Sequence, residues 1–322
     1  MRSCAPRPKD LWSGVNSYFI HTLPESDQES LLSSLHAAGV SKIRIFITKF
    51  GKGGKNTTSV GANDLEEQTV GVYNDTILNQ IDQLMYRMEK YNMKLLIAMH
   101  DYWVLVDEYF ICDAYCQKYC KNPAVFYNTT QAAHDIDNRY KHIINHRNPY
   151  LKNRKYKDLD NVIYAVELQN EAQGEGIVNP YWWCDRATEL RKHMRDSGVL
   201  ISTGGGRTFV MSNSTINFNC KALDVIAIHS YDTNIQEVIT NFNNAKYLKR
   251  AKQVVVFEEF GIQAGSGSLQ AKWLDAVGQV SNTLNVNWMP WEVSSVSLPN
   301  DYEFNDSDTA TWAALVKNNP HP

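Results

Sequence analysis

Short, almost continuously apolar runs alternate along this chain with longer segments whose apolar residues recur at helical spacing. Runs such as KLLIAMH at 94–100 and QVVVFEEF at 253–260 are typical of parallel strands, which are covered on both faces. These runs predict eight strands, at 11–20, 42–48, 94–100, 162–169, 200–203, 224–229, 253–257 and 286–291. Helical periodicity predicts helices at 27–38, 75–91, 130–145, 181–197, 235–252, 268–282 and 309–317.

This alternation of strand and helix predicts an α/β protein with a single (β/α)8 TIM barrel over residues 1–322. No linker or shift in composition divides the chain, although no helix is evident between 200 and 224. Two long segments, 49–74 and 101–128, follow predicted strands. In a barrel such βα loops lie on the C-terminal face, where active sites are built.

Composition narrows the classes of function. The chain has 322 residues, of which 43% are hydrophobic and 21% charged, so it can bury a large core. The net charge of -3 argues against nonspecific binding to nucleic acid or to an anionic membrane. No apolar run approaches the roughly 20 residues of a membrane helix. We therefore expect neither nucleic acid nor a membrane as partner, and we expect the protein to be a monomer.

The cysteines and glycosylation motifs favour a secreted, extracellular glycoprotein. Six cysteines allow up to three disulfides with fifteen pairings, and five Asn-x-Ser/Thr motifs begin at Asn56, Asn74, Asn128, Asn213 and Asn305. Because Met1-Arg2-Ser3 runs directly into Cys4, we expect a mature form whose leader has been removed. The Cys112-x3-Cys116-x3-Cys120 run is compatible with a metal cluster, but disulfides in a long loop fit it better, since no CxxC pair accompanies it.

Two glutamates occur at the predicted ends of strands on opposite sides of the barrel. The fourth strand ends VELQNE, with Glu171 last, and the seventh ends in VFEEFG, which contains Glu259. Two carboxylates across one cavity are the minimum requirement for hydrolysing a glycoside. Either glutamate alone could equally form a structural ion pair or lie on the surface.

Other polar and aromatic residues gather at the same predicted edge. His229 and Tyr231 are two residues apart, so both point to one face of their strand. Arg44 lies inside the apolar run KIRIFI and requires an anionic partner. His100 ends the third strand and Trp291 the eighth. A lone histidine or tryptophan is often only a core residue, so the pattern matters more than any member.

Taken in order, these motifs resemble glycoside hydrolase family 5, whose members are retaining (β/α)8 barrel enzymes. The resemblance covers nearly the whole chain and rests on Arg44, His100, Asn170-Glu171, His229-x-Tyr231, Glu259-Phe260-Gly261 and Trp291. It implies a secreted hydrolase of β-linked polysaccharide or oligosaccharide that needs no cofactor and no metal.

The resemblance also implies roles for these residues. Glu171 would be the general acid/base and Glu259 the nucleophile, with carboxyl groups about 5–5.5 Å apart. Asn170 would bind the 2-hydroxyl of the sugar, and Arg44 and Tyr231 would orient Glu259. His229 would lie beside Glu171, His100 would contribute to the substrate site, and Trp291 would form the floor beneath the attacked sugar. Glu258 is the rival nucleophile, but strand alternation sends it to the opposite face from Glu259.

The doubled glutamate of VFEEFG resembles fungal endo-β-1,4-mannanases more than cellulases, whereas LQNEAQ departs from the ANEPR pattern usual in mannanases. Mannan is therefore the favoured substrate, with a β-1,4-glucanase or an exo-acting β-glycosidase with transglycosylation as alternatives. Trp103, with Tyr102, Trp182 and Trp183, could extend a sugar-stacking cleft or pack the rim of the barrel.

Two further classes compete with an enzyme of this kind. A non-catalytic carbohydrate-binding barrel would not need two opposed carboxylates. Nucleotide binding would rest on Gly204-Gly205-Gly206, which lacks both the G-x-G-x-x-G spacing and a clear following helix.

Overall fold

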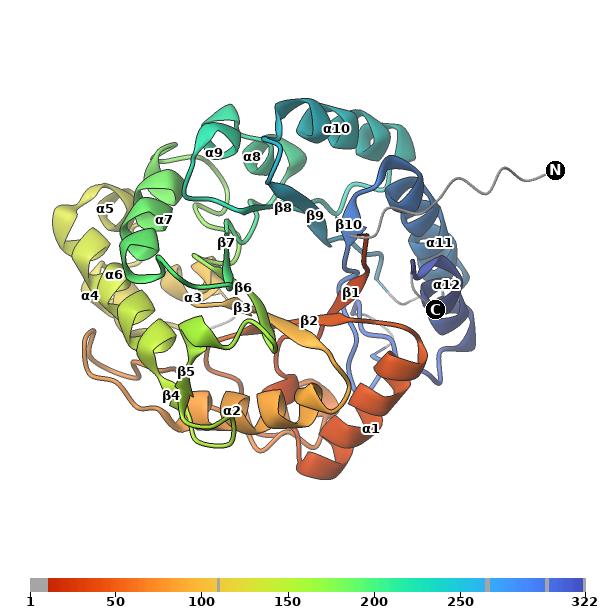
Figure 1. Ribbon diagram of the computed structural model, residues 1–322, viewed down its shortest axis with the longest axis horizontal. Helices are drawn as coiled ribbons and strands as arrows, with labels where there is room; N and C mark the ends of the chain where they lie inside the picture. The colour runs from red at the N-terminus through yellow and green to blue at the C-terminus, as the bar shows by residue number, and fades with distance from the viewer. Residues whose placement is uncertain (1–10, 109–110, 264–266, 299–300, 321–322) are drawn as a thin grey trace.

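The computed structural model describes residues 11–108, 111–263, 267–298 and 301–320. Within these residues eight parallel strands form one sheet in the order β1-β2-β3-β6-β7-β8-β9-β10. A parallel bridge between Ser13 and Trp288 joins the first strand region to the last. The sheet therefore curls into a nearly closed barrel with helices around it (Figure 1), and the predicted (β/α)8 fold is confirmed.

Each strand of the barrel coincides with a predicted apolar run. The strands are β1 Gly14–Asn16, β2 Lys42–Phe46, β3 Lys94–Ala98, β6 Ile163–Glu167, β7 Leu200–Ser202, β8 Val225–His229, β9 Val254–Glu259 and β10 Asn287–Trp288. The first is much shorter than its predicted range. A separate antiparallel pair, β4 Arg147–Asn148 and β5 Arg154–Lys155, lies outside the barrel.

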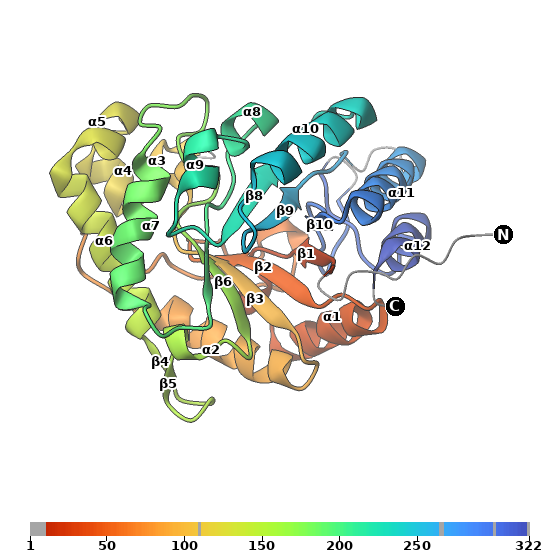
Figure 2. The same ribbon diagram turned by 45° about the horizontal axis from the view of Figure 1, so that its top comes forward.

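Helices form the outer layer, as Figures 1 and 2 show. The seven predicted helices correspond to α1 Glu25–Ala37, α2 Thr76–Glu89, α6 Thr130–Asn145, α7 Trp182–His193, α10 Ile235–Leu248, α11 Gly267–Leu284 and α12 Thr309–Asn318. Short helices occupy the loops: α3 Tyr102–Leu105, α4 Ala114–Lys118, α5 Pro123–Asn128, α8 Phe209–Ser212 and α9 Thr215–Asn219. Between 200 and 224, where no helix was evident, only the two short helices α8 and α9 form. Single helical turns of the 3-10 type are η1 Ile20–Thr22, η2 Gly54–Asn56 and η4 Tyr156–Asp158.

The barrel interior is packed rather than open. Its lower layer consists of Trp12, Leu96, Ala165, Val225, Val256 and Met289, all buried. A larger apolar core fills the space between the barrel and the helices. This division places the apolar inward residues at the bottom of the barrel and leaves its C-terminal end for polar side chains.

Disulfides tie parts of the outer layer together. Cys112 bonds to Cys116 within one loop, and Cys184 on α7 bonds to Cys220 at the end of α9. The prediction of disulfides is thus confirmed for these four residues, and Cys112 and Cys116 cannot be thiolate ligands of a metal cluster. Cys120 is free and exposed, whereas Cys4 lies outside the described residues. No helix in the described part of the chain is long and apolar enough to cross a bilayer.

Candidate active site

A cavity of about 1000 Å³ opens at the C-terminal ends of the barrel strands. Both long segments predicted on this face contribute to its wall, through Phe50 and Lys55 from one and Trp103 and Ile111 from the other. Most of the predicted site residues also line it, namely Trp103, Asn170, Glu171, Tyr231, Glu259 and Trp291. Parallel strands that end at one edge therefore bring together residues as distant in the sequence as Phe50 and Trp291.

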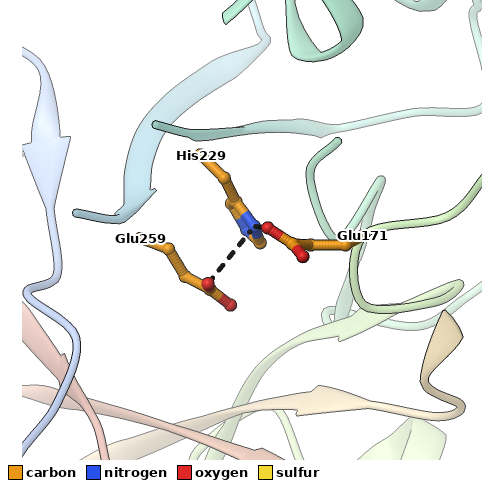
Figure 3. Close-up of side chains that lie close together, drawn as sticks. All are labelled: Glu171, His229 and Glu259. Carbon is orange, nitrogen blue, oxygen red and sulfur yellow. Dashed lines mark hydrogen bonds and ion pairs between the residues drawn. The ribbon is translucent and has the colours of Figure 1, made fainter. Parts of the chain in front are cut away.

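Glu171, His229 and Glu259 meet at the base of this cavity (Figure 3). Glu259 ends β9, His229 ends β8, and Glu171 follows β6 by four residues. One carboxylate oxygen from each glutamate and one ring nitrogen of the histidine lie within 4.8 Å of one another. Their carboxyl groups face each other with the imidazole between them (Figure 3). The predicted meeting of two carboxylates across one gap is what the fold produces.

Glu259 is held by a cation and a hydroxyl. Arg44 Nη1 forms an ion pair with Oε1 of Glu259, and the Tyr231 hydroxyl donates to Oε2 at 2.9 Å. His229 Nδ1 lies 3.6 Å from the same Oε2. Two donors on separate oxygens fix the plane of this carboxylate and direct it toward the cavity.

Glu171 is held by two ring N–H groups instead. The Trp103 indole donates to its Oε2 at 2.7 Å, and Nδ1 of His229 lies 3.2 Å from its Oε1. The backbone of Glu171 has a φ of 44°, a left-handed conformation that non-glycine residues seldom adopt. Its amide donates to the carbonyl of Gly204 at 3.0 Å, which helps to hold this conformation.

Arg44 connects the site from below and is fully buried. Its Nε donates to both oxygens of Glu167, at 3.1 and 2.9 Å. Its Nη1 also donates to Asn16 at 3.1 Å, and Nη2 donates to Asn170 at 2.8 Å. The predicted need of this arginine for an anionic partner is confirmed, and its guanidinium sets the mutual positions of Asn170 and Glu259.

Glu258 does not lie where strand alternation predicted. Its side chain is completely buried, 3.4 Å from Arg44 Nε and 3.0 Å from Nε2 of His229. The reason is an irregularity in the pairing of β8 with β9, where Ile228 pairs with Phe257 but His229 pairs with Glu259. The skipped Glu258 keeps the inward direction of Val256, and the next residue is turned inward as well. Glu258 does not appear among the residues that line the cavity, so Glu259 remains the carboxylate that can meet a ligand.

The cluster contains four carboxyl groups but only two cationic side chains. Burial, reinforced by nearby Glu258, raises the pKa of Glu167 to about 8. Burial also raises the pKa of Glu259, although His229 and Arg44 oppose the rise. With more acids than cations in a low-dielectric space, some of these carboxyl groups must retain protons.

The pKa values of His229 and Glu171 are shifted in opposite directions by the contact between the two side chains. Although burial alone would lower it, the pKa of His229 rises to about 10, because Glu259 is near and Glu171 and Glu258 accept its hydrogen bonds. Although burial alone would raise it, the pKa of Glu171 is lowered, because His229 and Trp103 donate to its carboxylate. At neutral pH the proton between them therefore belongs to the histidine.

This arrangement is suited to nucleophilic attack and proton transfer. Glu259 has a free approach from the cavity and a fixed orientation, while Glu171 faces it beside a protonated ring. The oxygen and nitrogen atoms of Glu171, His229 and Glu259 that could coordinate a metal ion are already hydrogen-bonded to one another or to neighbouring side chains. This favours nucleophilic attack and proton transfer over metal coordination.

His100 occupies a different position from the one predicted. Its Nε2 donates to Asp113 at 2.8 Å, and its Nδ1 accepts from Gln169 at 2.7 Å. It is buried and absent from the described residues that line the cavity. Because the 101–128 segment folds back over the end of β3, its Asp113 captures the ring. His100 therefore fastens this loop to the strand end rather than facing a ligand.

Some of the aromatic residues face the cavity, where a sugar could stack on them, and others pack the rim of the barrel. Trp103 faces the cavity, and Trp291 stacks on Tyr18 with ring centroids 5.4 Å apart and planes 10° apart. Trp182 and Trp183 are 3% and 1% exposed, so they pack the barrel rim. The predicted apolar floor is thus a stacked pair to which Tyr18, not anticipated from the sequence, contributes.

The glycine run at 204–206 has a steric explanation. A Cβ at Gly205 would lie 2.3 Å from the ring of His229, and one at Gly204 would lie 2.3 Å from the carbonyl oxygen of Gln169. Both glycines also have positive φ, 80° and 72° in chain order. The following helix α8 has only four residues, so this run makes room for the histidine rather than forming a phosphate loop.

Several charged residues of the site were not anticipated. Glu167 is one, although an acid inside the apolar run IYAVEL carries the same signal as Arg44 inside KIRIFI. Lys55 is another: its Nζ lies 2.7 Å from Glu292, 3.1 Å from Asp301 and in contact with Glu303. No periodicity marks such loop residues, because their meeting depends on how two long loops cross the mouth of the barrel.

Comparison with known proteins places this geometry among relatives. A family model described as "GH family 5 beta-mannosidase-like" matches residues 20–279. In sequence, the chain is 23% identical over 320 residues to a "Probable mannan endo-1,4-beta-mannosidase A-1" of Aspergillus terreus, an alignment that covers 90% of this chain and 78% of that protein.

Solved structures with low sequence identity share the fold. An endo-1,4-β-mannanase from Rhizomucor miehei superposes with a TM-score of 0.76 at 17% identity, covering 98% of this chain and 96% of that one. A family 5 mannosidase from the same organism gives a TM-score of 0.72 at 16% identity, covering 97% and 93%. A variant of the latter was crystallised with mannosyl-fructose.

Proposed function

This chain belongs to glycoside hydrolase family 5, in its β-mannosidase-like group, and we propose that it cleaves β-1,4-mannan or its oligosaccharides with retention of configuration. The observation that carries the proposal is the approach of Glu171 and Glu259 to within 4.8 Å at the base of the cavity. Carboxyl groups about 5–5.5 Å apart are typical of retaining glycosidases, whereas inverting enzymes separate them by about 6.5–9.5 Å.

In the first half of the reaction Glu259 attacks the anomeric carbon. The ion pair with Arg44 and the Tyr231 hydroxyl keep its attacking oxygen ionised and directed toward the cavity. Glu171, on the other side of the gap, protonates the departing glycosidic oxygen. The products of this step are a free leaving-group alcohol and a glycosyl ester on Glu259.

In the second half Glu171 acts as a base. It removes a proton from a water molecule, which attacks the anomeric carbon and releases Glu259 as a carboxylate. Asn170 lies next to Glu171 and is fixed by Arg44 and by Asp101, to which it donates at 2.9 Å. A side chain held in this way is placed to bind the 2-hydroxyl of the sugar, an interaction that strengthens as the transition state forms.

Mannan is favoured over the other β-linked glycans of this family by two facts. The family model that matches most of the chain is β-mannosidase-like, and the Aspergillus relative carries a mannan endo-1,4-β-mannosidase name. The stacked Trp291 and Tyr18 provide an apolar surface for the C–H face of a pyranose ring.

An extracellular location fits the surface chemistry. Asn56, Asn74 and Asn128 are exposed, as N-glycosylation requires. The two disulfides are of the kind that persists in oxidising compartments.

Variants of the two glutamates test the assignment of the reaction. Glu259→Ala and Glu171→Ala should each lower kcat on mannotetraose by about 10³-fold or more, because a nucleophile or its proton donor is lost. On an aryl β-mannoside whose leaving group departs without protonation, azide should restore turnover as an external nucleophile, giving an α-mannosyl azide with Glu259→Ala and a β-mannosyl azide with Glu171→Ala. Glu89→Ala, an exposed position at the end of α2, is the matched control and should match the wild type. If each glutamate variant retains more than a tenth of wild-type activity, the assignment is wrong.

A substrate panel tests the specificity. We expect reducing sugar to appear fastest from glucomannan, galactomannan or mannotetraose, and more slowly from carboxymethyl cellulose, barley glucan and xyloglucan. Proton NMR of the first product should show the β-anomer before mutarotation. Faster release from cellulose than from any mannan would overturn the substrate, while an α-anomer would overturn the mechanism.

A further inference from the structure

One buried carboxylate in the cluster has no part in the mechanism so far. Glu258 is 0% exposed, lies adjacent to the proposed nucleophile in sequence, and is excluded from the cavity wall. Its Oε2 lies 3.0 Å from Nε2 of His229, while its Oε1 has no hydrogen-bond partner within the described part of the chain. Burying a carboxylate so completely costs free energy unless its charge is paired with a cation or a hydrogen-bond donor.

His229 lies between two carboxylates, one on each ring nitrogen. Nδ1 faces Glu171 at 3.2 Å and Nε2 faces Glu258 at 3.0 Å. The ring itself is fully buried, and Gly205 allows the backbone to approach it from the side. The three side chains therefore form one continuous hydrogen-bonded line, Glu258–His229–Glu171, which ends at the cavity.

Charges on β2, β6 and β9 act on this line. Arg44 on β2 lies 3.4 Å from Glu258 and Glu167 on β6 shares that arginine. Glu259 on β9 lies 3.6 Å from Nδ1 of His229. The guanidinium of Arg44 is thus divided among three carboxylates, so Arg44 and His229 together balance the anion on Glu258, whose pKa they lower against the effect of burial.

We propose that Glu258 is a positioning residue that holds His229 as a doubly protonated store of the proton that Glu171 delivers to the leaving group. This inference rests on the proposed function, since it assigns to Glu171 the same acid/base role. By accepting from Nε2, Glu258 keeps that proton in place and leaves the proton on Nδ1 as the mobile one.

The proton then moves along this hydrogen-bonded line, and over the full reaction the number of protons on the three side chains does not change. In the first half-reaction the Nδ1–H bond breaks and an O–H bond forms on Oε1 of Glu171, leaving a neutral ring that still donates from Nε2 to Glu258. Glu171 passes this proton to the glycosidic oxygen as the C–O bond to the leaving group breaks. In the second half-reaction the attacking water gives a proton to Glu171, which returns it to Nδ1.

This relay accounts for an apparent contradiction in the site. The pKa of Glu171 is lowered by its hydrogen bonds from His229 and Trp103 despite burial, which suits a base better than an acid. The ring beside it holds the missing proton, with a pKa raised to about 10. Because the ring is fully buried, its proton is available only to the neighbouring carboxylates.

The decisive experiment is the pH dependence of kcat/KM in Glu258→Gln. Removing the anion destabilises the imidazolium, so the pKa of His229 falls and the alkaline limb should move by at least one pH unit toward neutrality. Glu258→Asp keeps the anion and should restore the limb most of the way. A residue that served only packing would lower kcat without moving the limb.

Glu167→Gln is the matched control. Glu167 is equally buried, but its carboxylate accepts from Arg44 Nε rather than from a ring nitrogen of His229. Its alkaline limb should stay closer to the wild type than that of Glu258→Gln. If both variants move the limb equally, the effect is one of general charge and the relay is overturned.

A direct measurement covers the case in which Glu258→Gln fails to fold. Nitrogen-15 NMR of histidine-labelled wild-type protein should show His229 with both ring nitrogens protonated at pH 8. A neutral ring at pH 8 would overturn the proposal whatever the variants do. Loss of the proposed function would look different, because the wild-type enzyme would then fail on every mannan substrate while His229 still titrated as described.

Discussion

Two arginines among the described residues are buried completely, and they perform different tasks. Arg44 lies at the centre of the barrel, whereas Arg139 lies on α6 at its outside. Arg139 forms ion pairs with Asp64 and Glu66, and donates to the carbonyls of Ile47 and Met99 at 2.8 and 2.7 Å. Both guanidinium groups are therefore rich in acceptors, and burial alone does not distinguish them.

The difference lies in where their partners come from. Both acids of Arg139 belong to the 49–74 segment, and the two carbonyls lie just beyond β2 and β3, so this arginine fastens a loop to the ends of strands. The carboxylate partners of Arg44 come from β6 and β9, and one of them, Glu259, reaches the cavity. A buried arginine whose acidic partners lie within one loop supports structure, and one that links several strands at a cavity supports chemistry.

The largest expected effect follows from replacing Arg44. Arg44→Met should lower kcat/KM by about 10³-fold or more, because it removes the donor that orients Glu259 and leaves several buried carboxylates without a cation. Kinetics on mannotetraose would be measured at a temperature where circular dichroism shows the variant folded. Arg44→Lys keeps the charge but not the forked geometry of the guanidinium. Its kcat/KM should therefore lie between those of the wild type and Arg44→Met. A folded Arg44→Met enzyme with more than a tenth of wild-type activity would contradict the catalytic role that distinguishes Arg44 from Arg139.

Replacing Arg139 should produce a loss of stability instead. Arg139→Met leaves Asp64 and Glu66 buried without their cation, which costs about 3–5 kcal/mol of unfolding free energy. Urea unfolding would measure the loss, and kcat per folded molecule should stay within about threefold of the wild type, a margin of less than 1 kcal/mol. An undiminished midpoint in urea, or a large fall in kcat at full folding, would contradict the role assigned to this arginine.

The smallest of the three effects concerns the neutral donor to the nucleophile. Tyr231→Phe removes the 2.9 Å hydrogen bond to Glu259 but leaves the ion pair with Arg44. A hydrogen bond to a charged group is worth about 1.5–3 kcal/mol, so kcat should fall by about 10- to 100-fold. The pKa of Glu259, already raised by burial, should rise further, so the acid limb of the pH profile should move to higher pH. Activity is lost as pH falls through this pKa, and an unmoved limb would mean that Tyr231 does not act on the carboxylate.

The sequence predicted well the features that depend on regular strand periodicity. The eight apolar runs correspond to the eight barrel strands, and Glu171, Glu259, Tyr231 and Trp291 were placed at strand ends that prove to line one cavity. Arg44 could be expected to meet an anion, because a charge within an apolar strand must be compensated when it points inward.

Errors arose where strand geometry is irregular or a loop folds back. Glu258 was sent to the wrong face because the pairing shift beside His229 leaves no mark in the residue pattern. His100 was placed in the substrate site, but Asp113, thirteen residues later, takes its ring. The bond from Trp103 to Glu171 depends on the position of α3 and likewise could not be predicted.

By itself, then, the amino-acid sequence determined the barrel, the edge at which polar residues gather and which carboxylates reach it, because these follow from strand periodicity and parallel direction. Only the tertiary structure decided how four carboxyl groups share two cations, and that Glu258 also points inward, beside His229. Those outcomes depend on distances of a few ångströms between separate strands in a medium of low dielectric, where small displacements change which group keeps its proton.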